Sequence, residues 1–379
     1  MSRAEAKSMA ANNPCSFLRV SRAEIGLPHT VGAYDEAVYQ QAAANLRYFE
    51  HAGYLVREKS PSFYIYRISN ETHSQTGIAF AASVEAYNAN RIRKHELTRP
   101  TKEDDRVRQI EATNAETAPV LLAHKDDSSL AAAISDNTEG SPDLTSHVDG
   151  WQHDIWIVSD SARVNQLSNQ LNAFDAFYIA DGHHRSAAAA RVCAARDNEQ
   201  SLPHHGFLAV SFAASEMRIL DYNRVVRDLR DYTADAFLGV LDKDFDVEIS
   251  GAAVAPKNRG EFGMFLGDSW YTLRLKRTSA SGDPVEQLDV RLLYRYLLSP
   301  LLDIKDPRTD ERIDFIGGSR GTAAVEARVT SGDMAVGFTL CPTPMADLMA
   351  VADANRIMPP KSTWFEPKLA DGLISLPLD

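Results

Sequence analysis

The feature that most constrains the fold is a strand, a tight turn and a helix that meet at residues 180–185, Ala-Asp-Gly-His-His-Arg. An apolar run precedes this string at residues 174–179, and an Ala-rich run follows it at residues 186–195. The pattern predicts a β-strand that passes through a Gly turn into a helix. Because the first turn of a helix exposes backbone N–H groups and the positive end of its dipole, the junction predicts a site for a phosphate or carboxylate.

Ionisable side chains gather at this junction. Arg185 adds a planar, permanently charged fork that suits an anion. Asp181, His183 and His184 add a carboxylate and two imidazoles, and such clusters at a strand end are typical of catalytic or binding sites. Each residue also has a structural interpretation, since Asp caps helices, Gly makes turns and a lone His packs in cores. Two adjacent His between an Asp and an Arg favour the functional interpretation.

Two further strings combine charge with irregular backbone. Residues 95–100, His-Glu-Leu-Thr-Arg-Pro, predict an active-site loop, whereas the charged residues after Lys102 fit a solvated helix with ion pairs equally well. Residues 358–368 contain three Pro, which keep them out of regular structure. The sequence Lys361, Ser362, Thr363 within them offers an ammonium and two hydroxyls to an anion, although a stiff connector would look the same.

The length of 379 residues exceeds that of a usual single core, so we expect two domains or one large core with insertions. We expect a core at residues 1–230, a small α+β insertion or subdomain at 231–287, and helices and loops that complete the core and the site at 288–379. Within the core, the patterns predict a short strand at 16–20, an antiparallel pair at 62–68 and 76–84, and a strand at 206–212 beside the one that ends at Asp181.

Composition excludes several classes of function. The formal net charge of −12 disfavours nonspecific DNA binding, which needs an excess of Lys and Arg. No apolar run is long enough to cross a bilayer. Cys15, Cys193 and Cys341 lie far apart, which disfavours a disulfide framework and indicates a reducing cytoplasm.

The signature strings of several enzyme classes are missing from the sequence. It contains no motif of a Rossmann dehydrogenase, a Walker ATPase, a zincin or an α/β-hydrolase. A zinc site built from His183, His184, His204 and His205 is disfavoured, because the side chains of adjacent His diverge and would not supply a tetrahedral set.

Five strings together resemble one known family: residues 13–22, 95–100, 110–114, 179–185 and 358–368. Through them the chain resembles the bacterial and archaeal family DUF1015, whose uncharacterised members are sometimes labelled ParB-like. The Asp-Gly-His-His-Arg string is similar to the nucleotide-binding motif of the ParB/sulfiredoxin fold, which also includes the free-serine kinases. The resemblance implies an α+β fold with a ParB/sulfiredoxin-like mixed-sheet core and an additional smaller α+β portion.

The chain departs from these relatives in two respects. Members of the family usually begin with a further segment that contains a Pro-Tyr-Asp-Val-like string, so we expect the start of this sequence to be truncated or misassigned. ParB proteins that bind centromere DNA carry a helix-turn-helix and basic surfaces, which this sequence does not support. The resemblance therefore implies the catalytic side of the fold more than the DNA-binding side.

On this basis we expect a cytoplasmic nucleotide-dependent phosphotransferase that uses ATP or ADP with Mg²⁺. Its partners would be the nucleotide and a small hydroxylated metabolite such as serine, with neither nucleic acid nor membrane. Glu96 would be the base, Arg185 and the helix start would hold phosphate, the two His would contact phosphate or stabilise charge, and Lys361 would close over the substrate. The residues assigned to the site are Glu96, Asp181, His183 and His184 in catalysis, Gly182, Arg185, Arg99, Lys102, Lys361, Ser362 and Thr363 in cofactor binding, and Asp181 as metal ligand.

Two alternatives remain open at the level of sequence. One is a ParB-like nucleotide or nucleic-acid binding protein that turns over no metabolite. The other is a scaffold or binding protein whose charged loops are only solvated surface. The first would bind DNA in a salt-sensitive manner, and the second would show no stabilisation by nucleotides.

Overall fold

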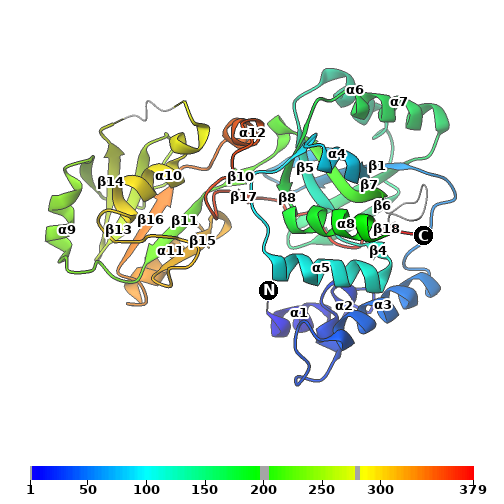
Figure 1. Cartoon of the computed structure of the whole chain (residues 1–379), viewed down its shortest axis with the longest axis horizontal. Helices are drawn as coiled ribbons and strands as arrows, with labels where there is room; N and C mark the ends of the chain where they lie inside the picture. Colours follow the sequence, from blue (N-terminus) through cyan, green and yellow to red (C-terminus); the bar gives the residue numbers. More distant parts are fainter. Residues whose placement is uncertain (1, 197–204, 278–281) are drawn as a thin grey trace. The chain divides into compact units, whose positions relative to one another are not determined.

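The computed structural model describes residues 2–196, 205–277 and 282–379, and these residues form two compact units (Figure 1). The first unit comprises Met1–Glu216 and Pro367–Asp379, and the second comprises Met217–Glu366. The boundaries expected near residues 230 and 287 both fall inside the second unit. They do so because strands before, between and after these positions pair in one sheet.

An eight-stranded sheet forms the centre of the first unit, in the order β3-β8-β5-β9-β2-β1-β7-β6. Two of its strand pairs, β3 with β8 and β5 with β9, are parallel, and the others are antiparallel. This mixed sheet confirms the predicted α+β class. Its strands are β1 (Phe63–Ser69), β2 (Ser74–Ser83), β3 (Ile92–Arg93), β5 (Val120–His124), β6 (Leu144–Val148), β7 (Trp151–Val158), β8 (Phe177–Asp181) and β9 (Gly206–Ala213).

The neighbour of β8 differs from the sequence expectation. The antiparallel pair β1–β2 is confirmed, but the expected pairing of the strand at 206–212 with the strand that ends at Asp181 is wrong. β5 lies between β8 and β9. All five residues of β5 are buried, which suits a strand that pairs on both sides in the middle of a sheet.

Helices surround this sheet, and one of them replaces an expected strand. The segment at 16–20 contributes to helix α2, because Val20 packs against Leu46 and Phe49 of α3 and the amide of Ser21 donates to the Phe17 carbonyl. The helices are α1 (Arg3–Ala10), α2 (Leu18–Ser21), α3 (Glu36–His51), α4 (Val84–Asn88), α5 (Pro100–Thr113), α6 (Ser128–Asp136), α7 (Ser161–Asn172) and α8 (His183–Ala195), with 3₁₀ turns η1 (Ala23–Gly26) and η3 (Ala214–Glu216).

The main core of the first unit fixes the strand that leads to the junction. Ile179 of β8 is fully buried in a cluster that also contains Ile65, Ile78, Leu122 and Phe207 from the neighbouring strands. Each such side chain contributes about 1.5–3 kcal/mol when it is fully buried. The end of β8 is therefore set by central packing, and the functional string that follows it starts from a fixed point.

The last residues of the chain complete the first unit. Strand β18 (Leu376–Pro377) pairs with β4 (Ala115–Glu116). The amide of Gly372 donates to the Thr117 carbonyl, and the amide of Leu378 donates to the Asn114 carbonyl. Residues 367–379 are thus integrated into a unit whose other residues lie at least 150 positions earlier in the sequence.

The second unit contains an antiparallel six-stranded sheet in the order β12-β14-β13-β16-β11-β15. Between residues 232 and 276 the second unit contains one helix and three strands. The strands are β10 (Ile219–Leu220), β11 (Tyr222–Val226), β12 (Phe245–Ser250), β13 (Glu261–Leu266), β14 (Ser269–Leu275), β15 (Ile313–Gly317), β16 (Val336–Leu340) and β17 (Trp364–Phe365). The helices are α9 (Ala234–Leu241), η4 (Pro284–Gln287), α10 (Asp289–Leu293), η5 (Tyr294–Leu298), η6 (Gly318–Arg320), α11 (Gly321–Thr330) and α12 (Met345–Asp353).

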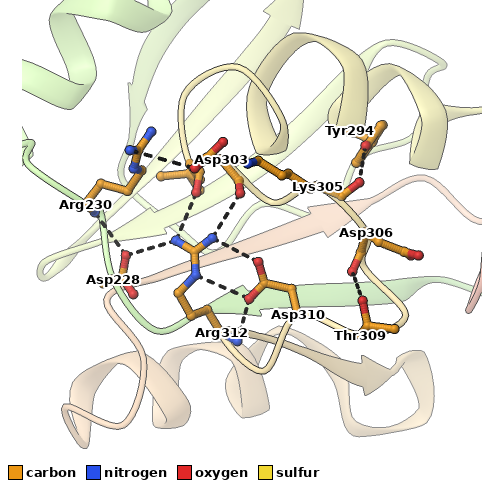
Figure 2. A network of polar contacts seen from close by, with 10 residues as sticks. Asp228, Arg230, Tyr294, Asp303, Lys305, Asp306, Thr309, Asp310 and Arg312 are labelled. Carbon is orange, nitrogen blue, oxygen red and sulfur yellow. Dashed lines mark hydrogen bonds and ion pairs between the residues drawn. The ribbon is translucent and has the colours of Figure 1, made fainter.

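The charged loop before β15 is held together by Arg312 (Figure 2). The Arg312 guanidinium pairs with Asp310 at 2.9 Å and with Asp228 at 3.4 Å. It also donates to the carbonyls of Leu302 and Asp303, at 3.0 and 3.1 Å. These contacts satisfy the guanidinium within the second unit, so the network serves to fold this loop.

Candidate functional site

The junction between β8 and α8 has the predicted form of strand, Gly turn and helix. β8 ends at Asp181 and α8 begins at His183, with Gly182 between them at φ 106° and ψ 24°. Side chains with a Cβ rarely adopt this backbone conformation. A Cβ at Gly182 would also lie only 2.9 Å from Nε of Arg185. Glycine therefore makes the turn and leaves room for the Arg185 guanidinium directly beside it.

Two cations lie beside the carboxylate at the end of β8. Nη2 of Arg185 is 2.9 Å from Oδ2 of Asp181, and Nζ of Lys368 is 3.9 Å from the other carboxylate oxygen. Burial would raise the pKa of Asp181, but the charges of Arg185 and Lys368 together hold it below its usual value. Asp181 is therefore charged at neutral pH, and the three side chains carry one net positive charge at the start of α8.

Sequence reasoning missed three ionisable residues in the environment of Arg185. They are Lys368, Asp371 and Glu116. Burial raises the pKa of Glu116 to about 8 and also raises that of Asp371, while the positive charge of Arg185 opposes both shifts. Glu116 is 5% exposed and one of its oxygens accepts the Leu208 amide at 2.9 Å. The sequence signal that could have identified Glu116 is a single acidic residue close before the apolar run at 119–123.

The expected active-site loop at residues 95–100 is irregular up to Pro100, where α5 begins. We name residues 94–99 the Glu96 loop. Its backbone is bonded to both His of the junction: the amide of His95 donates to Nε2 of His183 at 3.4 Å, and the amide of Arg99 donates to Nε2 of His184 at 3.0 Å. The structure thus brings the two separate strings of the sequence together.

The imidazoles of this region are neutral at pH 7. Burial lowers the pKa of His95 to about 4 and that of His183 well below its usual value. Burial also lowers the pKa of His184, with Arg99 and Lys102 adding to the effect and Glu103 opposing it. A neutral imidazole has one nitrogen free to accept a hydrogen bond, which agrees with the amides that His183 and His184 accept.

His95 itself is almost completely enclosed. Its side chain is 1% exposed, and its ring meets that of His183 edge to face with centroids 4.5 Å apart. Neither ring nitrogen meets the geometric criteria for a hydrogen bond with a partner in the described residues, although the nearby Ile179 backbone favours the charged ring and partly opposes the lowering of its pKa by burial. A buried polar ring without partners opposes the folded position of the Glu96 loop.

The remaining expected residues of the first unit lie on or next to the Glu96 loop. Glu96 is partly buried, and Arg99 is exposed. The Thr98 hydroxyl donates to the Glu103 carboxylate and braces the loop against α5. Lys102 lies on the first turn of α5, where its ammonium donates to the Tyr34 hydroxyl at 2.7 Å.

Lys361, Ser362 and Thr363 belong to the second unit. The Lys361 carbonyl accepts a hydrogen bond from Arg224 at 2.8 Å, and its ammonium lies 5.4 Å from the centre of the Tyr222 ring. Ser362 is 3% exposed and its hydroxyl donates to the Pro359 carbonyl at 2.6 Å. These contacts fold the loop itself, and a role for the three residues in binding a cofactor stays a prediction.

The described residues offer little to a metal ion on their own. Among them, no group of three or more His, Cys, Asp and Glu is placed to hold one. Asp181 supplies one carboxylate that is already paired with Arg185. Mg²⁺ often takes only one or two protein carboxylates and completes its shell with phosphate oxygens and water. One carboxylate such as that of Asp181 is compatible with this chemistry, and its role as a metal ligand stays a prediction. For zinc, Nε2 of His183 and of His184 accept different amides, and His204 lies outside the described residues.

Comparison with protein families identifies the chain. The model of DUF1015, described as a protein of unknown function, matches residues 1–291. The chain belongs to this family. A comparison with curated proteins finds no match, and in the described residues no helix has the length and apolar character that a membrane span requires.

Several solved structures are similar to this member of DUF1015 at low identity. A conserved hypothetical protein from Pyrococcus furiosus is 14% identical with a TM-score of 0.36, over 78% of this chain and 93% of that one. C-terminally truncated SbnI from Staphylococcus aureus is 12% identical with a TM-score of 0.40, over 77% and 85%. A free serine kinase in complex with AMP is 14% identical with a TM-score of 0.38, over 86% and 96%. Likeness at this level assigns no role to any residue here.

Proposed function

We propose that the protein is a nucleotide-dependent phosphotransferase that acts on a small hydroxylated metabolite. The observation that carries the proposal is the cationic start of α8, where Arg185 lies against Gly182 and Lys368 lies beside the Asp181 carboxylate. Exposed amides of a helix start and two cations suit the oxygens of a phosphoryl group. Phosphoryl transfer depends mainly on such positioning and charge stabilisation.

Glu96 is the proposed base. It is a partly buried carboxylate in a loop whose backbone is bonded to the first turn of α8, so it is tied to the same junction as the cations. A carboxylate in this place can orient the acceptor hydroxyl or take up its proton. ATP or ADP is the proposed phosphate donor, and Mg²⁺ bound with it through Asp181 would neutralise charge on the phosphate oxygens.

The direct test is detection of products by mass spectrometry. The protein is incubated with Mg²⁺, with ATP or ADP, and with a pool of amino acids as candidate acceptors. Formation of a phosphorylated acceptor supports the proposal. Absence of any phosphorylated product, together with salt-sensitive DNA binding that responds to CTP, would instead support a ParB-like binding protein.

The Glu96→Gln variant tests the assignment of the base. We expect it to abolish turnover while nucleotide still binds, because the amide keeps the shape of the side chain and cannot take up a proton. Glu111→Gln is the matched control, since Glu111 is an exposed residue further along α5. Nearly normal turnover in Glu96→Gln would remove Glu96 from this role.

A further inference from the structure

The two consecutive His of the junction hold the Glu96 loop at two points, one on each side of Glu96. Nε2 of His183 accepts the amide of His95, and Nε2 of His184 accepts the amide of Arg99. We propose that His183 and His184 are positioning residues that fix the Glu96 loop, and that they do not bind the transferred phosphoryl group. The inference rests on the proposed function, in which Glu96 is the base.

The spacing of these contacts explains why two adjacent His are needed. Successive side chains of a helix diverge by about 100° around its axis, so two neighbouring rings reach two separate points. The points they reach are the amides of residues 95 and 99. A single His could accept only one of these two amides, and the loop could then rotate about that one hydrogen bond.

Both ends of the Glu96 loop are anchored to regular structure. On one side, β3 pairs with β8 through Ile92 opposite Phe177 and Arg93 opposite Tyr178. On the other side, Arg99 is the residue before the first turn of α5, which packs along α8. The His contacts therefore complete a set of connections that join the Glu96 loop to the strand and helix of the junction.

The chemistry of the hydrogen bonds favours the positioning role. A backbone N–H can only donate, so each Nε2 must be unprotonated. An Nε2 that accepts a backbone amide cannot at the same time donate to a phosphate oxygen. His183 and His184 each use Nε2 as an acceptor of a backbone amide, which suits a structural contact to the loop.

The enclosed ring of His95 explains why the loop requires this support. Its two ring nitrogens lack hydrogen-bond partners among the residues that the structure describes, which favours conformations in which the loop lifts and water reaches the ring. The amide of the same residue is bonded to His183. The contacts with His183 and His184 oppose this opening and keep Glu96 beside the start of α8.

Substitution of His184 tests the proposal, because this residue is only partly buried and tolerates change better than His183. His184→Gln keeps an acceptor that can reach the amide of Arg99, whereas His184→Phe keeps a ring of similar size and removes the acceptor. Amide hydrogen exchange of residues 94–99, followed by mass spectrometry, reports the state of the loop without any need for activity. Arg99→Ala is the control, since it keeps the backbone amide.

We expect the loop to exchange faster in His184→Phe and at the wild-type rate in His184→Gln and Arg99→Ala. In turnover of the identified acceptor, His184→Phe should lower kcat by about 100-fold with little change in the nucleotide KM. His184→Gln should restore kcat to within about threefold of the wild type. Thermal unfolding shows that each variant folds, and His184→Leu replaces the Phe variant if that one does not.

Two outcomes would overturn the proposal. Unchanged exchange of the loop in a folded His184→Phe variant would show that the contact does not hold it. Equal loss of kcat in the Gln and Phe variants, with wild-type exchange in the former, would show that the imidazole itself takes part in the reaction. If the wild type forms no phosphorylated product, the proposed function fails, while the exchange rates still decide whether His184 holds the loop.

Discussion

Replacement of Gly182 by Ala separates the two reasons for glycine at the junction. The left-handed conformation of this residue costs a side chain with a Cβ about 1–2 kcal/mol. In a unit of this size, that cost corresponds to a fall in Tm of about 2–8 °C. The new Cβ would also meet the Arg185 guanidinium at 2.9 Å. Because the guanidinium is the end of a flexible side chain, it moves aside at little cost in stability.

The consequence for binding is larger than the consequence for stability. If Arg185 binds phosphate as proposed, its displacement removes charge-assisted hydrogen bonds that are each worth about 1.5–3 kcal/mol. We therefore expect nucleotide affinity to fall by about 10-fold to 100-fold. Isothermal titration with ATP and ADP measures this change, and thermal unfolding measures the change in stability.

Gly53 provides the matched control for this experiment. It has φ 74° and belongs to the same unit, and apart from its chain neighbours no heavy atom of the described residues lies within 4 Å of the place where its Cβ would be. Gly53→Ala should therefore lose a similar amount of stability and keep its full affinity for nucleotide. If Gly182→Ala binds nucleotide as tightly as Gly53→Ala does, the position of Arg185 is irrelevant to binding and the reasoning is refuted.

Two further expectations concern charges near the junction. Lys368→Ala should weaken nucleotide binding by about tenfold or less, with a smaller loss at high salt, because its ammonium is half exposed. Titration at two salt concentrations checks this, and equal effects of Lys368→Ala and of the exposed Lys125→Ala would contradict it. Burial raises the pKa of Glu116 from 4.5 to about 8. Between these two pH values the folded state keeps a proton that the unfolded state has released. The contribution of Glu116 to the free energy of unfolding therefore falls as the pH rises from 4.5 to about 8. Urea unfolding should show less of this decline in Glu116→Gln, and an identical decline would disprove the assignment.

The junction was predictable because its signals are local. An apolar run, a Gly and an Ala-rich run define β8, the turn and α8 within 22 residues of sequence (174–195). The irregular Glu96 loop followed equally from its own string. Sequence periodicity could not show that the amides of this loop bond to His183 and His184, because such contacts depend on how β3 pairs in the sheet.

Other features escaped prediction for identifiable reasons. The short apolar run at 16–20 fits a strand or a helix equally, and packing against α3 decides in favour of α2. Strand β11 was obscured by Asn223 and Arg224, two polar residues that are nevertheless buried. Asn223 accepts the Leu340 amide at 3.2 Å, and Arg224 donates to the Lys361 carbonyl. Buried polar residues with distant partners leave no periodic signal.

The division of the first unit into two stretches of sequence sets the order in which the protein can assemble. A ribosome releases residues 1–216 first and then the whole of the second unit, and only afterwards the segment that carries Lys368 and β18. Domains generally fold as units during synthesis, beginning with the N-terminal one. Until the second unit has been made, the nascent first unit therefore lacks β18, the partner strand of β4, and Lys368, one cation of the proposed anion site. The positive charge that Lys368 places beside Asp181 therefore joins the first unit only after the second unit has been made.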